Sequence, residues 1–151
     1  MKKWKTMMLV CTVGLSLIGC GKDTTQTFTS DRSPEGDIEA VIRNHVSSEY
    51  QKTDIESITI NADLGTEEPD DYIALINLTW NVKNSGSTAK EVLTVYSEDL
   101  AATLGNECPS VQEVAIFWTV PYLNDATAKC SYERSDSGMV EMDMSWTPVF
   151  Q

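Results

Sequence analysis

The segment Tyr72–Lys83, YIALINLTWNVK, decides the fold that we expect for this chain. Every second residue is apolar, which is the period of a β-strand with one buried face. The apolar face comprises Tyr72, Ala74, Ile76, Leu78, Trp80 and Val82. The opposite face begins with Ile73 and Leu75 and continues with Asn77, Thr79 and Asn81. We therefore expect a half-buried strand that is more apolar at its start.

Four further segments alternate in the same way and extend the predicted sheet. They are residues 58–62, 114–120, 128–132 and 140–146. In the last segment, the residues expected on one apolar face are Val140, Met142, Met144 and Trp146. The turn Asp136-Ser-Gly138 precedes this segment and predicts a hairpin with the strand before it.

Two segments show the three- and four-residue spacing of amphipathic helices. The first helix is expected over residues 37–51, with Asp37 or the earlier Ser33 as its N-cap. The second is expected over residues 88–104. Thr88 and Glu91 form a capping box at its start, and Gly105 stands at the C-cap position.

The predicted elements follow one another in the order α-β-β-α-β-β-β. Single-faced strands favour an antiparallel sheet, and two helices are able to cover its apolar face. We therefore predict an α+β fold, a two-layer sandwich with an antiparallel sheet of about five strands. The order is loosely similar to that of the cystatin-like and NTF2-like families, and this resemblance implies a curved antiparallel sheet around a helix.

The N-terminus has the parts of a secretory signal. Lys2, Lys3 and Lys5 precede an apolar run over residues 7–18, and Leu17-Ile-Gly-Cys20 follows. This ending resembles the lipobox of bacterial lipoprotein precursors. The resemblance implies that residues 1–19 are removed and that Cys20 carries diacylglycerol, with palmitate-type chains holding the protein at the extracytoplasmic face of a membrane. Residues 20–36 then read as a flexible tether and residues 37–151 as a single domain.

The chain is strongly acidic, with a net charge of −12. Removing a signal that carries three lysines and no acidic residue would lower this charge to −15. Nucleic-acid binding is disfavoured, because phosphate contacts need a basic surface. Broad adhesion to anionic lipid headgroups is disfavoured for the same reason.

The four cysteines are Cys11, Cys20, Cys108 and Cys130. Outside the cytoplasm, the last two are expected to form a disulfide. The alternative is that they are two separate buried thiols. Two cysteines do not make a four-ligand zinc site, so neither a metal nor a cofactor is expected.

An acidic loop is expected at the tip of the first hairpin. Its acidic residues are Asp63, Glu67, Glu68, Asp70 and Asp71. They are candidates for contact with a basic partner or with Ca²⁺, although a solvated hairpin tip is the favoured explanation, and their spacing is not that of an EF-hand. Tyr122, which follows Pro121 at a strand end, is the best candidate for an exposed aromatic contact. Trp80, Trp118 and Trp146 alternate with aliphatic residues and are expected in the core.

Catalytic motifs are absent from the sequence, which has no Gly-x-Ser-x-Gly or His-Glu-x-x-His segment. His45 is the single histidine, and Glu49 lies one turn away from it. We therefore expect a non-catalytic, lipid-anchored extracytoplasmic domain that binds an unknown protein or peptide partner. A small-ligand binding module of the cell envelope is the alternative, and a hydrolytic enzyme using His45 is a weaker one.

Overall fold

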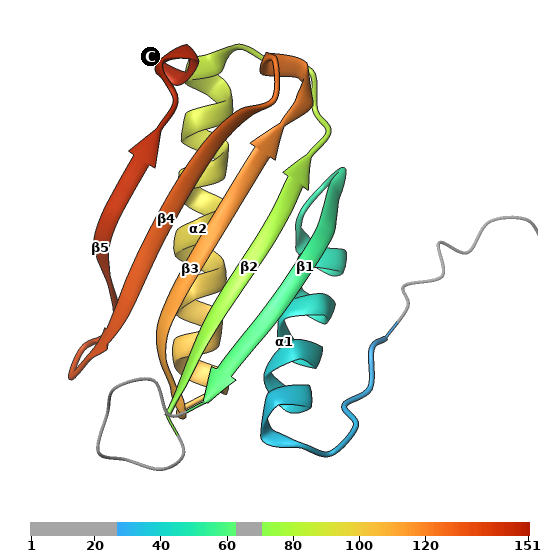
Figure 1. Ribbon diagram of the computed structural model, residues 1–151, viewed down its shortest axis with the longest axis vertical. Helices are drawn as coiled ribbons and strands as arrows, with labels where there is room; N and C mark the ends of the chain where they lie inside the picture. The colour runs from blue at the N-terminus through green and yellow to red at the C-terminus, as the bar shows by residue number, and fades with distance from the viewer. Residues whose placement is uncertain (1–26, 63–70) are drawn as a thin grey trace, which may run out of the picture.

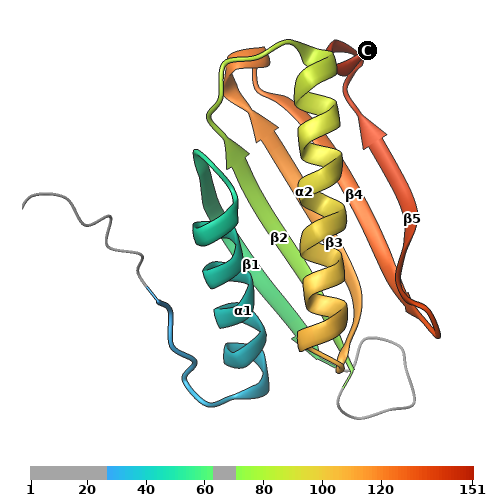
Figure 2. The same ribbon diagram turned by 180° about the vertical axis from the view of Figure 1, so that it is seen from behind.

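The fold is α+β, as predicted, with two helices and a five-stranded sheet in the predicted order. The computed structural model describes residues 27–62 and 71–151. The elements are α1 (Pro34–Glu49), β1 (Thr53–Ala62), β2 (Tyr72–Trp80), α2 (Gly86–Glu107), β3 (Val111–Val120), η1 (Pro121–Leu123), β4 (Ala126–Ser135), β5 (Gly138–Trp146) and η2 (Pro148–Phe150). Both helices lie behind the sheet in Figure 1 and in front of it in Figure 2, so one layer is helical and the other is the sheet. Within the described ranges, neither helix is long and apolar enough to cross a membrane.

The strands lie side by side in the order β1-β2-β3-β4-β5. The sheet is mixed, because β2 pairs with β3 in parallel while the other pairs are antiparallel. The prediction of an antiparallel sheet is therefore wrong at this pair. The reason is α2, whose 22 residues span about 33 Å. That length returns the chain along the whole of β2, so β3 starts at the same end as β2 and runs in the same direction.

The helices begin earlier than the sequence predicted, because serines cap both of them. The side chain of Ser33, the earlier of the two predicted N-cap candidates, accepts a hydrogen bond from the backbone N–H of Gly36, so α1 starts at Pro34 rather than at Asp37. Ser85 accepts from the backbone N–H of Thr88, so Thr88 lies inside α2 and does not cap it.

The end of α2 also differs from the prediction, because the helix continues through Gly105 and is capped at Cys108. Arg134 of β4 makes this end stable. Its guanidinium donates to the backbone carbonyls of Gly105 at 3.1 Å, Cys108 at 3.0 Å and Val111 at 2.8 Å. A cation at a helix C-terminus satisfies carbonyls that have no partner in the helix, so a C-cap glycine is not needed.

The core lies between the helices and the apolar face of the sheet. Five alternate residues of β2, from Tyr72 to Trp80, were predicted to be buried. All five are buried. The helices meet this face with Ile38, Ile42 and Val46 of α1 and with Leu93, Leu100 and Leu104 of α2. Trp118 of β3 is buried in the same core, and its Nε1 donates to Ser97 of α2 at 2.8 Å.

The prediction for β5 is wrong in its first half. The pairing of β4 with β5 shifts between Ser131 and Tyr132, which face Asp143 and Glu141, so Met142 is an extra residue in a bulge. A shift of one residue reverses the faces that the side chains occupy. Val140 and Met142 are therefore exposed, whereas Met144 and Trp146 pack against the core as expected.

Two glycines of α2 provide a test of how the helix packs. A Cβ atom on Gly86 would lie 1.8 Å from the backbone carbonyl oxygen of Val149, whereas one on Gly105 would meet the flexible side chain of Met139 at 2.8 Å. We expect Gly86→Ala to reduce the free energy of unfolding by about 1–3 kcal/mol, because η2 must move. Gly105→Ala should leave the free energy unchanged or raise it by up to about 1 kcal/mol, because alanine favours the helix. Urea unfolding measures both, and equal losses would contradict the close approach of η2.

Candidate functional site

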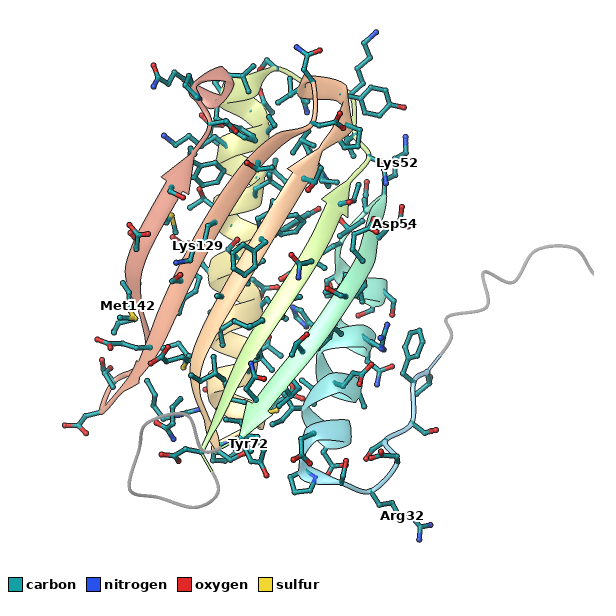
Figure 3. All side chains as sticks on the ribbon, viewed as in Figure 1. Arg32, Lys52, Asp54, Tyr72, Lys129 and Met142 are labelled. Atoms are coloured by element: carbon teal, nitrogen blue, oxygen red, sulfur yellow. The ribbon has the colours of Figure 1, made fainter. Side chains whose placement is uncertain are left out.

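The sheet has an open face, because both helices pack on the other side of it. This open face is turned toward the viewer in Figure 1, and Lys129 and Met142 are labelled on it in Figure 3. Its middle is apolar and half-buried, although no element of the described chain packs over it. The apolar residues there are Ile73 and Leu75 of β2, Ala115 and Phe117 of β3, and Met142 of β5, which is 54% exposed. We call these five residues the apolar floor.

Two adjoining hollows follow the open face along the strands. The first has a volume of about 420 Å³ and contains the apolar floor, with Glu113, Lys129, Ser131 and Asp143 around it. The second has a volume of about 540 Å³ and a more polar lining, which includes Asn77, Thr119, Thr127 and Ser145. Phe117 and Lys129 line both hollows, so together they form one groove that is more apolar at one end and more polar at the other.

Three carboxylates surround the apolar end of this groove. Glu113 of β3 and Glu133 of β4 are directly opposite each other in the register, and both are exposed. Asp143 of β5 faces Ser131 of β4 and lines the first hollow. We call Glu113, Glu133 and Asp143 the acidic rim. Lys129, opposite Phe117, is the cation that lines the groove.

Ser131 adds an unsatisfied polar group to the first hollow. Its hydroxyl oxygen is buried and has no hydrogen-bond partner among the described residues. A buried hydroxyl without a partner costs free energy, and a ligand that reached it would recover that cost. The hollow therefore combines an apolar surface with one hydroxyl that is unpaired but covered.

Of the residues predicted to contact a partner, the structure describes Asp71 and Tyr122, and it does not bring these two together. Asp63, Glu67, Glu68 and Asp70 lie outside the described residues, as does Cys20. Asp71 stands just before β2, where its carboxylate accepts from Gln112 at 3.2 Å. Tyr122 is 58% exposed, as predicted, but it follows the end of β3. Because β2 and β3 are parallel, Asp71 and Tyr122 lie at opposite ends of the sheet.

Cys108 and Cys130 are both buried and free, so the expected disulfide is not present in the structure. Cys130 pairs with Ile116 in the middle of β3, whereas Cys108 lies beside Val111, where β3 starts. These two levels of the strand are about 15 Å apart at the usual rise per residue. A disulfide needs Cα atoms within about 7 Å of each other, so the two thiols stay separate.

His45 of α1 contacts Asp99 of α2. Its Nε2 is 2.6 Å from Oδ2 of Asp99 on α2, so Asp99 rather than the predicted Glu49 orients it. The hydroxyl of Tyr50 donates to the same carboxylate at 3.2 Å and to the backbone carbonyl of Tyr96 at 2.5 Å. Burial is the main cause that raises the pKa of Tyr50 far above its usual range, and the negative charge of Asp99 adds to it. This network joins α1 to α2.

The three tryptophans agree with the sequence prediction. Trp80 and Trp118 are buried, and Trp146 is half-buried against the core. The ring of Trp146 packs edge-on against Phe150 at 5.2 Å between centroids, and Lys90 lies 5.6 Å from its centre.

Part of the predicted tether contacts the domain. The backbone N–H of Phe28 donates to the side chain of Asn44 at 2.7 Å, and the side chain of Asn44 donates to the carbonyl of Phe28 at 3.0 Å. The guanidinium of Arg43 lies 5.7 Å from the centre of the Phe28 ring. The chain is therefore attached to the helical layer, and the open face of the sheet lies on the other side.

Comparison with known proteins adds nothing to this geometry. Neither protein-family models, nor curated proteins, nor solved structures gave a match to the chain. Within residues 27–62 and 71–151, no three histidine, cysteine, aspartate or glutamate side chains are grouped to hold a metal ion.

The sequence analysis missed the acidic rim and the groove. One signal was present, because Ile73 and Leu75 made the second face of the first strand apolar at its start. The remaining members become neighbours only through strand register and the bulge in β5, and neither feature has a local signal in the sequence.

The two thiols provide a direct test of the buried arrangement. Burial is the main cause that raises the pKa of Cys108 to about 11, and it also raises the pKa of Cys130. At pH 8 we expect both thiols in the Cys11→Ser/Cys20→Ser variant to react with iodoacetamide about 100-fold more slowly than in urea, because little thiolate is present and access is blocked. Mass spectrometry counts the modified sites. A mass gain of about 2 Da on reduction would show the disulfide instead.

Proposed function

We propose that this protein is a non-catalytic, lipid-anchored extracytoplasmic domain that binds a protein or peptide partner through the open face of its sheet. The observation that carries the proposal is the groove, in which an apolar floor is left uncovered. A hollow that is lined by apolar side chains and has polar groups at its edge is the usual form of a binding site. Covering such a surface contributes roughly 25 cal/mol for each Å² of apolar area removed from water.

The shape of the groove favours an extended segment of a partner. The two hollows adjoin along the strands, and the second has the more polar lining. The apolar floor offers contact to a bulky side chain, and polar side chains of the second hollow, among them Asn77 and Thr119, offer hydrogen bonds to a peptide backbone. The attachment of Phe28 to α1 supports the same arrangement, because a tether that leaves from the helical layer keeps the groove accessible.

A small ligand is the second candidate, and one observation favours it. The first hollow has a volume of about 420 Å³, which lies within the range of small-molecule sites. Such sites bury most of the ligand, however, and the groove has a floor but no second layer above it in the described chain. A peptide, which brings its own bulk and backbone hydrogen bonds, fits this surface better.

The groove is tested by selecting random peptides on the immobilised whole chain. We expect selected peptides to bind Phe117→Ser about 10- to 150-fold more weakly, because a bulky apolar contact of roughly 1.5–3 kcal/mol is lost. Val95→Ser is the matched control, since Val95 is 59% exposed on α2 in the helical layer. Circular dichroism and urea unfolding verify that both variants fold. Equal affinity for the two variants would exclude the open face as the binding surface.

The lipid anchor is tested by Cys20→Ser in a bacterial host. We expect the unchanged chain to stay with washed membranes and to carry the added mass of diacylglycerol on Cys20. The variant should lack this mass and keep the residues that precede Cys20, because lipid addition precedes cleavage in the precursors that the N-terminus resembles. Intact-mass analysis of the membrane and supernatant fractions measures both properties. Unchanged processing and unchanged mass on the variant would rule out the anchor.

A further inference from the structure

The acidic rim contains a like-charge pair that the protein itself does not neutralise. Glu113 and Glu133 face each other directly across β3 and β4. Like charges in this position destabilise a sheet. In the described part of the chain, the ion pairs are Arg43 with Glu39 and His45 with Asp99, so no lysine or arginine pairs with the acidic rim. The repulsion is therefore left for something outside the described chain to relieve.

The acidic rim and the apolar floor occupy the same end of the groove. Glu113 and Asp143 line the first hollow together with Leu75, Phe117 and Met142. Glu133 is opposite Glu113 on one side and opposite Val140 of β5 on the other. An apolar surface with carboxylates around it is complementary to a bulky apolar side chain with cations beside it.

We propose that the groove binds a basic segment of a partner protein. One bulky apolar side chain of this segment enters the first hollow, and neighbouring lysine or arginine side chains pair with Glu113, Glu133 and Asp143. This inference rests on the proposed function and names the chemistry of the partner. The net charge of −12 acts in the same direction, because it attracts a basic segment over long range at low salt.

Lys129 provides a test of the charge that the ligand carries. Its side chain lines the groove, opposite Phe117 in the register, and makes no ion pair in the described part of the chain. It repels a basic ligand and attracts an anionic one. Removing its charge should therefore strengthen the binding of a basic segment and weaken the binding of an anionic ligand.

The test uses the whole chain in detergent and three heptapeptides blocked at both ends. The first peptide has leucine, phenylalanine and leucine at its centre, with two lysines on each side. The second has glutamate in place of each lysine, and the third has serine in place of each apolar residue. Fluorescence anisotropy of the labelled peptides measures affinity at low and high salt, with protein-free detergent as the blank.

The variant for the acidic rim is Glu113→Gln/Glu133→Gln, and the matched control is Glu91→Gln/Glu98→Gln. Glu91 and Glu98 are exposed on α2, so the control changes the net charge equally on the helical layer. We expect the first peptide to bind the rim variant about five- to tenfold more weakly and the control less than about twofold more weakly. Lys129→Gln should bind it about twofold more tightly, and high salt should weaken binding to the unchanged chain.

Each alternative outcome separates this inference from the proposed function. If the glutamate peptide binds more tightly than the lysine peptide and loses this affinity in Lys129→Gln, the inference of a basic partner is wrong. The groove would then be a site for an anionic segment. If the rim variant and the control weaken binding equally, the affinity depends on the net charge of the protein and not on the acidic rim. This result would also contradict the inference of a basic partner. Strong binding of the serine peptide would show that the apolar floor does not contribute to the affinity and would contradict the proposal. If peptides from the random selection bind the groove but the first peptide does not, the proposed function is supported and the inference of a basic partner is wrong.

Discussion

The packing of α2 against β3, β4 and β5 is the constraint on which the rest of the structure depends. Its 22 residues match the length of the strands that it crosses, and this match makes β2 and β3 parallel neighbours at the centre of the sheet. Leu93, Leu100 and Leu104 then lie in the core on one face of the sheet. Both helices are used on that face, so the opposite face stays without a cover in the described chain.

The buried face was predictable because strand alternation is a local property of the chain. The residues from Tyr72 to Trp80 needed no knowledge of their neighbours to be placed correctly. The direction of β3 was predictable in principle, since a helix as long as the strand before it returns the chain to the same end. The pairing of Glu113 with Glu133 and the contact of His45 with Asp99 depend on segments far apart in sequence, so periodicity alone does not reveal them.

The bulge in β5 shows how one residue alters the character of a surface. With a regular register, Val140 and Met142 would have joined Met144 and Trp146 against the core. The extra residue at Met142 turns Val140 and Met142 to the open face, where Met142 lines the first hollow. A bulge on an edge strand also weakens the pairing of that edge with another strand. The same local irregularity therefore adds apolar surface to the groove and discourages nonspecific extension of the sheet.

An uncovered apolar floor carries a risk of self-association, and the acidic rim lowers that risk. Two copies of the chain meeting face to face would bring Glu113, Glu133 and Asp143 of each copy together, with one Lys129 per groove to offset them. Like-charge contacts of this kind suppress unsuitable partners, and the net charge of −12 adds to the repulsion. The carboxylates of the acidic rim thus have two effects. They keep copies of the chain apart, and they attract a ligand of opposite charge.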